Sequence, residues 1–303
     1  MALTAPVEVS ATFPCFGGTA SVLALGTDDL RPAVRAARQR LEAWHDRLTR
    51  FEPRSEISRL NASTTAHVRV SDLMCLFVAA AIGAARRTNG LVDPTLLDEI
   101  EDAGYRTDLG EPLQLAVSLH RAPPRRPAAP DPRARWSEIA LDGATRTVTR
   151  PPGVRIDSGG IAKGLFADLA GEALARSDSY AVDCCGDLRL GGSAKLARIV
   201  RVDDPFGRGV LHELELVAGG VATSGIGRRS WIGPDGRPAH HLLDPSNGRP
   251  AFTGVVQATA LAPTALEAEV RAKAAVLAGP VQGRHWLPRG GVLVFDDGSH
   301  EVL

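Results

Sequence analysis

A glycine-rich segment with a lysine, Ile156-Asp-Ser-Gly-Gly-Ile-Ala-Lys-Gly164, is the part of the sequence best suited to bind an anion. Its two adjacent glycines stand just before an expected helix, whose first N–H groups are free and whose dipole is positive at that end. Lys163 would add a mobile positive charge. The segment therefore indicates a phosphate site, although a strand-to-helix turn that merely needs glycine fits it equally well. No G-x-G-x-x-G follows an expected strand, and no Walker A sequence is present.

Three further segments carry groups that could assist chemistry at a phosphate. His241 stands three residues before Asp244, so the two could form a general base and its orienting carboxylate, although such a pair is more often structural. Val221-Ala-Thr-Ser-Gly225 offers small hydroxyl donors, or it is only a turn. The segment 181–189 reads as an apolar strand that ends in an acidic, glycine-containing turn, and its two cysteines are interpreted as packing residues.

The composition excludes several classes of protein. The 35 basic and 35 acidic residues cancel, which argues against a dedicated nucleic-acid binder. No run approaches the roughly 20 apolar residues of a membrane span, and residues 1–10 lack the basic and apolar regions of a secretory signal. The four cysteines show no metal-site spacing, so we expect a cytoplasmic protein. Only three basic residues are lysines, namely Lys163, Lys195 and Lys273.

The elements that must position these residues alternate irregularly, which favours an α+β fold with mixed, mainly antiparallel sheets and inserted helices. Periodicity predicts helices that begin near Asp28 and that cover about 71–87, 161–176 and 264–278. Strands are expected at 19–25, 180–190, 197–203, 211–217, 255–262 and 291–296, with a hairpin at 136–150. We expect one domain over 14–300, a Pro/Arg-rich loop or linker at 121–135, and a disordered segment at 1–13.

Taken together and in order, these segments resemble the ApbE family, the FAD:protein FMN transferases, over about residues 14–297. The glycine-rich segment resembles the family's D-L-G-G-I-A-K-G, with Asp168 also in register, and His241–Gly248 resembles H-I-I-D-P-x-T-G. Five shorter matches complete the series: Gly17–Thr19 (M-G-T), Ser55–Asn61 (S-E-[IL]-S-x-[LF]-N), Asp93–Thr95 (D-[PI]-T), Cys185–Asp187 (G-G-D) and Thr223–Gly225 (T-S-G).

The resemblance implies the ApbE fold and an enzyme that moves FMN from FAD to a Thr or Ser hydroxyl of a flavoprotein acceptor. FAD hydrolysis to FMN and AMP, or flavin binding without catalysis, are the alternatives. By resemblance, His241 would take the proton from the hydroxyl and Asp244 would orient it. Residues implied at the FAD site are Gly18, Thr19, Asn61, Asp93, Thr95, Asp157, Lys163, Asp187, Thr223, Ser224 and Gly225.

The family also uses Mg²⁺, and here the sequence departs from its pattern. The family carries A-D-x-x-x-T on its last helix, whereas this chain has Ala268-Glu-Val-Arg-Ala-Lys273. By resemblance, the Ala162 carbonyl and Glu269 would be metal ligands, but Lys273 cannot ligate a cation while protonated. Glu269 and Lys273 could simply form a surface ion pair. We hypothesise instead that the ammonium occupies the metal region and pairs with Glu269 or a flavin phosphate, so that transfer would be slow, metal-independent or lost.

Overall fold

An eight-stranded antiparallel sheet forms the centre of the computed structural model, which describes residues 5–107 and 110–303. Alternation builds it: on β2, Ala20, Val22 and Ala24 are fully buried while the residues between them are partly exposed. The strands, in spatial order, are β1 (Val7–Cys15), β2 (Gly18–Gly26), β6 (Ser179–Cys184), β7 (Asp187–Gly191), β10 (Gly219–Gly225), β15 (Val255–Ala262), β16 (Gly291–Phe295) and β17 (His300–Val302).

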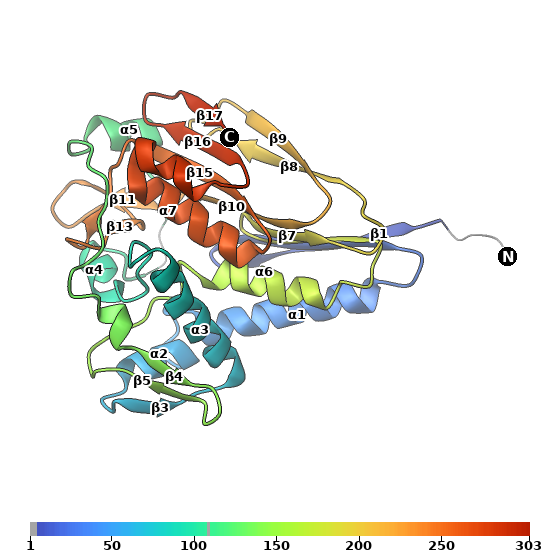
Figure 1. Ribbon diagram of the computed structural model, residues 1–303, viewed down its shortest axis with the longest axis horizontal. Coiled ribbons are helices and arrows are strands. Elements are labelled where there is room, and N and C mark those ends of the chain that lie inside the picture. Colours follow the sequence, from blue (N-terminus) through green and yellow to red (C-terminus); the bar gives the residue numbers. More distant parts are fainter. Residues whose placement is uncertain (1–4, 108–109) are drawn as a thin grey trace.

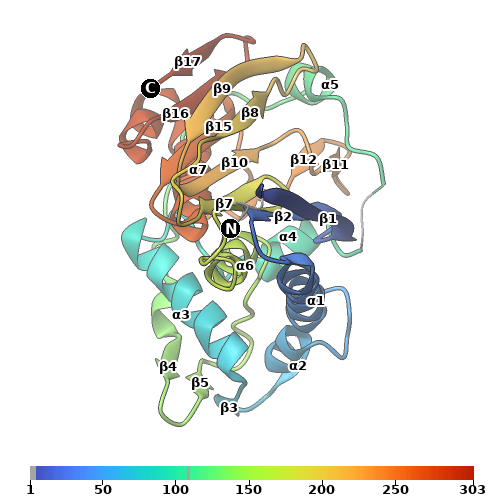
Figure 2. The same ribbon diagram turned by 90° about the vertical axis from the view of Figure 1, so that its right-hand side faces the viewer.

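Three helices cover one face of this sheet (Figures 1 and 2). They are α1 (Arg31–Leu48), α6 (Ala162–Glu172) and α7 (Ala265–Gly283). The α1 stripe of Val34, Ala37 and Leu41 is buried against the sheet, as its spacing predicts. The helix α7 is interrupted at Gly279, where φ is 76°, and Pro280 follows.

A long hairpin covers part of the other face. It consists of β8 (Arg198–Asp203) and β9 (Val210–Leu216). Ala181, Leu190, Val200 and Val221 form a buried cluster between this hairpin and the sheet. The sheet is therefore buried on both faces where β6, β7 and β10 cross it.

The remaining elements lie outside the central sheet, and some of them form a further layer beyond the helices that cover it (Figures 1 and 2). A three-stranded sheet has the order β3-β5-β4, and two further pairs are β11–β12 and β13–β14. The helical elements here are α2 (Glu56–Ala62), α3 (Asp72–Arg87), α4 (Leu97–Asp102), α5 (Leu115–His120), η1 (Arg135–Glu138) and η2 (Arg284–Trp286). The short strands are β3 (His67–Arg69), β4 (Ala140–Asp142), β5 (Thr147–Thr149), β11 (Ser230–Ile232), β12 (Pro238–His240), β13 (Leu243–Asp244) and β14 (Arg249–Pro250).

The α+β prediction is confirmed, but several local predictions were wrong. Residues 7–13 belong to strand β1 and are not disordered, while residues 1–4 lie outside the described part of the chain. The segment 180–190 is two strands joined by a turn at Cys185 and Gly186, both at positive φ. The first helix begins at Arg31, because the Asp29 side chain accepts from the Arg31 N–H and holds a turn there.

The Pro/Arg-rich segment 121–135 is a loop as expected, yet it is fixed to the fold. The N–H groups of Arg126 and Ala128 donate to the carbonyls of Phe252 and Leu277 at 2.9 Å each. Asp131 is buried, so the segment is not a solvated linker. Across the described residues, no helix has the length and apolar character needed to cross a membrane.

Candidate functional site

A cavity of about 1410 Å³ opens where α6, α7 and the ends of the central strands meet the shorter elements. Its size exceeds that of ordinary drug-sized ligand pockets, which reach about 1,000 Å³, and suits a dinucleotide-sized molecule. Twelve of the residues predicted from sequence line it: Gly18, Thr19, Asp93, Asp157, Ala162, Lys163, Thr223, Ser224, Gly225, His241, Glu269 and Lys273.

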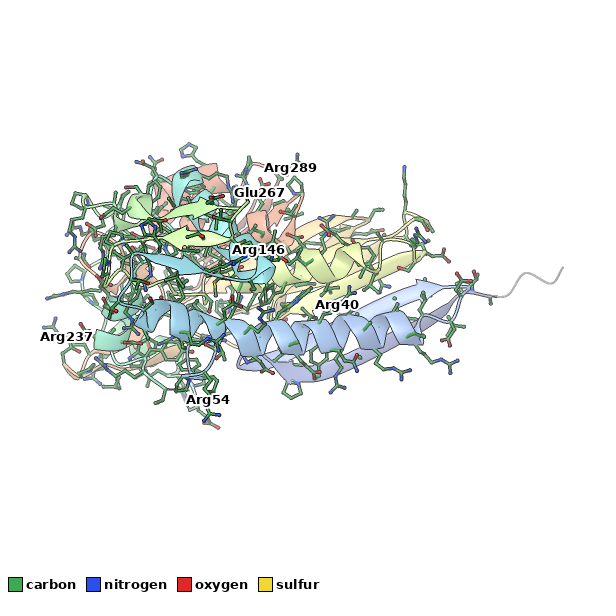
Figure 3. The ribbon with its side chains drawn as sticks, turned by 90° about the horizontal axis from the view of Figure 1, so that it is seen from below. Arg40, Arg54, Arg146, Arg237, Glu267 and Arg289 are labelled. Atoms are coloured by element: carbon green, nitrogen blue, oxygen red, sulfur yellow. The ribbon has the colours of Figure 1, made fainter. Side chains whose placement is uncertain are left out.

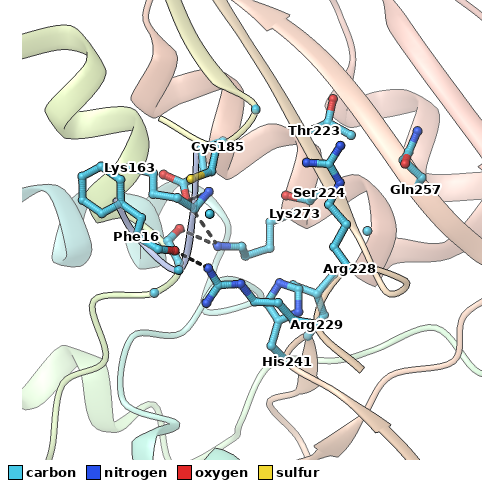
Figure 4. Close-up of a pocket in the computed structure, with 18 of the residues that line it drawn as sticks. Phe16, Lys163, Cys185, Thr223, Ser224, Arg228, Arg229, His241, Gln257 and Lys273 are labelled. Carbon is cyan, nitrogen blue, oxygen red and sulfur yellow. Dashed lines mark hydrogen bonds and ion pairs between the residues drawn. The ribbon is translucent and has the colours of Figure 1, made fainter. Parts of the chain in front are cut away.

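Two lysines and two carboxylates form a buried cluster at the wall of this cavity. Lys163, near the start of α6, forms an ion pair with Asp187 at the start of β7. Its ammonium also lies 3.5 Å from Glu269 Oε1. Lys273, one turn along α7 from Glu269, lies 3.8 Å from the same oxygen and donates to the Gly160 carbonyl at 2.5 Å. Figure 4 shows both ammonium groups directed at one region of the cavity.

The local charges set the protonation of this cluster. Burial would lower the pKa of Lys163, but the Asp187 and Glu269 carboxylates outweigh it and raise that pKa above the ordinary value. Lys163 therefore remains an ammonium at neutral pH. Burial lowers the pKa of Lys273, with Glu269 acting in the opposite direction. The cluster thus holds Lys163, whose positive charge is stabilised by carboxylates, beside Lys273, whose positive charge is disfavoured by burial.

His241 faces the cavity from the turn between β12 and β13, beside Arg229 (Figure 4). Burial lowers its pKa well below 6.5, and the Arg229 and Lys273 charges lower it further. The imidazole is therefore neutral at neutral pH and can accept a proton. Its Nδ1 atom is buried and makes no hydrogen bond within the described residues.

The expected partnership of Asp244 with His241 is not what the structure shows. Asp244 Oδ1 accepts from the Ala129 N–H and from Ser246, and its Oδ2 accepts from Asn247 Nδ2 at 2.7 Å. The carboxylate therefore fixes the turn after β13 and its contact with the 121–135 segment. The sequence spacing misleads because His241 lies in the turn between β12 and β13, whereas Asp244 belongs to β13 and is engaged by its own turn.

Three other predicted FAD-site residues also lie outside the cavity lining, and each contacts a lining residue or the backbone next to one. Asn61 at the end of α2 makes two hydrogen bonds to the backbone of Ile156, at 2.9 and 2.8 Å. Thr95 donates its hydroxyl to Asp93 at 2.6 Å. Asp187 forms an ion pair with Lys163, which lines the cavity. These residues position the lining of the site.

Arg229, which the sequence did not single out, is central to the site. Its guanidinium donates to Tyr105 Oη at 2.8 Å and to the Phe16 carbonyl at 2.5 Å. Phe16 lies at the tip of the β1–β2 hairpin with φ of 56°, and it also lines the cavity. Arg50, a second missed residue, lies over the rings of Phe51 and Tyr105 at 4.5 and 4.4 Å.

No sequence signal separates these two arginines from the other 30 in the chain. Most of those labelled in Figure 3, including Arg40, Arg54 and Arg237, extend from the surface into solvent. Lysine is rare enough here for its positions to be informative, whereas arginine is not.

Comparisons with known proteins agree with this geometry. The ApbE family model matches residues 8–295. The chain belongs to the ApbE family. Among curated relatives, the FAD:protein FMN transferase of Treponema pallidum is 30% identical over 244 residues, which are 74% of this chain and 65% of that protein. The match therefore spans just under two thirds of that relative's length. The Salmonella typhimurium protein of the same name is 26% identical, over 82% of this chain and 71% of that one.

Solved structures of ApbE proteins have the same fold. The crystal structure of the ApbE protein from Thermotoga maritima superposes with a TM-score of 0.80 at 25% identity, covering 98% of this chain and 97% of that chain. The apo flavinyl transferase ApbE of Pseudomonas stutzeri superposes with a TM-score of 0.77 at 21% identity, covering all of this chain and 96% of that one.

The predicted magnesium ligands do not fit a divalent cation in this chain. Glu269 Oε2 accepts from the Gly164 N–H at 3.0 Å, and Oε1 faces the two lysine ammonium groups. Mg²⁺ needs near-octahedral oxygen ligands at about 2.0–2.1 Å, which an ammonium at that position excludes. Within 5–107 and 110–303, no group of three His, Cys, Asp or Glu side chains is arranged to hold a metal.

Proposed function

We propose that this ApbE protein binds FAD and transfers its FMN moiety to a Thr or Ser hydroxyl of a flavoprotein acceptor. Family membership supports the flavin substrate, since curated relatives that match most of the chain are named FAD:protein FMN transferase. The cavity is large enough for FAD, and cationic side chains line it for a pyrophosphate: Arg50, Lys163, Arg228, Arg229 and Lys273.

The observation that carries the proposal is an imidazole, His241, whose Nδ1 makes no hydrogen bond within the described residues and which lines the same cavity as the lysine cluster. Asp244 is engaged elsewhere, and burial together with the neighbouring cations lowers the pKa of His241, so that the ring is neutral at neutral pH. A base and a cationic site on one cavity are the two groups that phosphoryl transfer to a hydroxyl requires.

The acceptor hydroxyl oxygen attacks the phosphorus of the FMN half, and a P–O bond forms. The bond from that phosphorus to the bridging oxygen breaks, and AMP leaves with the electron pair. His241 takes the hydroxyl proton, while Lys163 and Lys273 offset negative charge on the phosphate oxygens. Water in place of the acceptor hydroxyl would give free FMN and AMP.

A second function, FAD binding without catalysis, is favoured by one observation. Lys273 stands on α7 one turn from Glu269, where a ligand for a catalytic cation would stand if the family pattern held. Binding alone would then leave FAD intact and any acceptor unlabelled.

The test incubates the purified protein with FAD and a flavoprotein domain that carries the family's target motif. Flavin fluorescence on the acceptor in a denaturing gel supports transfer. FMN and AMP without a labelled acceptor indicate hydrolysis, and retained FAD without either product indicates binding only. The variant His241→Asn should bind FAD but lose labelling, whereas His285→Asn, at an exposed position outside the cavity lining, should behave like the wild type. Full labelling by His241→Asn would remove His241 as the base.

A further inference from the structure

The buried lysine cluster brings two lysines and two carboxylates to the place where the family pattern would put a metal ion. Lys163 and Lys273 face Asp187 and Glu269 in this cluster. The carboxylate side chains are each 1% exposed, whereas those of Lys163 and Lys273 are 20% and 10% exposed. The lysine side chains are therefore the more accessible members of the cluster, and both line the cavity.

Lys273 retains hydrogen-bonding capacity toward a ligand. An ammonium has three N–H donors. The Gly160 carbonyl accepts one at 2.5 Å, and Glu269 Oε1 lies 3.8 Å away. Lys273 makes no other side-chain hydrogen bond among the described residues, so it keeps donors for a ligand in the cavity that it lines.

The surrounding backbone leaves room for this ammonium and fixes its position. A Cβ atom at Gly160 would lie 2.6 Å from Lys273 Nζ, so a side chain there would push the ammonium aside, whereas glycine leaves it in this position. A Cβ atom at Gly164 would lie 2.7 Å from the Ala265 carbonyl oxygen, so α6 and α7 meet there in close contact. This contact holds Lys163 and Lys273, on different helices, toward one carboxylate.

We propose that Lys273 takes the place of a divalent cation, so that this chain binds the pyrophosphate of its dinucleotide, and acts on it, without metal. The identity of that dinucleotide as FAD rests on the proposed function. In the transfer step, the Lys273 ammonium donates to a non-bridging or leaving phosphate oxygen and offsets the charge that develops there. The protonation balance is unchanged, because the acceptor proton still goes to His241.

The experiment measures FAD affinity by flavin fluorescence, with protein dialysed against EDTA and again with millimolar MgCl₂. We expect the two dissociation constants to agree within about twofold. In EDTA, Lys273→Met should weaken FAD binding about tenfold or more, as expected for loss of a charge-assisted hydrogen bond. Lys195→Met is the matched control and should change nothing, because Lys195 is exposed and lies outside the cavity lining. FAD binding that tightens tenfold with Mg²⁺ in the wild type would overturn the inference without the use of any variant.

Direct metal binding gives an independent measurement. Mn²⁺, a paramagnetic substitute for Mg²⁺, should keep its full free-ion electron paramagnetic resonance signal when wild-type protein is added. Stoichiometric loss of that signal overturns the inference. The double variant Glu269→Asp, Lys273→Thr removes the ammonium and restores oxygen ligands, so it should bind Mn²⁺; failure to bind it counts against the exchange of lysine for metal.

These outcomes separate the inference from the proposed function. Tight FAD binding that requires Mg²⁺ removes the inference and leaves flavin transfer standing. FAD binding without acceptor labelling in either buffer removes transfer, and the comparison of EDTA with Mg²⁺ still decides the role of Lys273. No FAD binding in either buffer overturns both.

Discussion

The carboxylate of Asp168 holds the start of α7, and removing it should destabilise the protein measurably. Asp168 on α6 accepts from the backbone N–H groups of Ala265 and Leu266 at 2.8 and 3.0 Å. These are first-turn donors that have no partner within their own helix. Each hydrogen bond to a charged group is worth about 1.5–3 kcal/mol, and an anion at a helix N-terminus adds about 0.3–1 kcal/mol.

Burial offsets part of this gain, since it raises the pKa of Asp168 above the ordinary value. We therefore expect Asp168→Ala to lower the free energy of unfolding by about 2–4 kcal/mol. Asp168→Asn keeps an oxygen acceptor without the charge and should lose about half as much. Because α7 carries Glu269 and Lys273, the alanine variant should also weaken FAD binding.

The assay is urea unfolding followed by circular dichroism, with Glu172→Ala as the control. Glu172 is exposed one turn further along the same helix, so its removal should change stability by less than about 0.5 kcal/mol. An Asp168→Ala variant as stable as this control would refute the reasoning. Equal losses for the alanine and asparagine variants would show that the charge contributes nothing.

Two further predictions concern packing and pH. Gly164→Ala should destabilise the fold by about 1–3 kcal/mol in the same unfolding assay, because its Cβ would meet the α7 backbone at 2.7 Å. The control Gly143→Ala has open space around its Cβ and should be near neutral. Equal effects of the two substitutions would argue against the α6–α7 contact. His240 is buried with its pKa lowered to about 3, chiefly by burial, so the unfolded chain binds more protons between about pH 3 and 6.5 and stability falls as the pH falls through that window. The wild type should lose about 1 kcal/mol more than His240→Gln between pH 6 and 5, and parallel pH profiles would contradict this.

Much of the helical structure follows from local sequence. The helix predicted over 71–87 is α3, Asp72–Arg87, and it begins where the Ser71 side chain accepts from the Met74 N–H. The end of this helix is marked by Asn89 and Gly90, both at positive φ. Here the capping residue, the apolar stripe and the glycine stop agree with one another.

The strands were harder to predict where neighbouring elements decide the conformation. Gly219–Gly225 has a composition with low strand propensity, yet it is the central strand β10, between β7 and β15. A side chain on Gly220 would collide with the backbone at Thr264, so the small residues there allow α7 to begin against the sheet. By contrast, the alternation of Val7, Val9, Ala11 and Phe13 was a readable signal of β1 that the expectation of disorder overlooked.

The residues of the site were likewise predictable only in part. Lys163 and Lys273 could be selected from sequence, because lysine is rare in this chain and because they lie in a glycine-rich segment and on a predicted helix. Arg229 could not, because its role depends on the Phe16 carbonyl and Tyr105 hydroxyl, which come from distant segments of the chain. The pairing of His241 with Asp244 failed because sequence proximity was taken for spatial contact.

From the sequence alone, Lys273 shares a helix face with Glu269. An i,i+4 ion pair of this kind is usually a weak surface interaction. The residues that pack against this pair from α6 and β7 change that interpretation. The helix α6 brings Lys163 and its partner Asp187 against the same Glu269 oxygen, and the carboxylates are buried while the ammonium groups border the cavity. A pair that only stabilised a helix surface would need neither the second lysine nor the glycine at 160 that leaves room for the ammonium. On the inference proposed above, this arrangement offers ammonium groups to a phosphate in place of a metal ion, and the comparison of FAD binding in EDTA and in Mg²⁺ tests it.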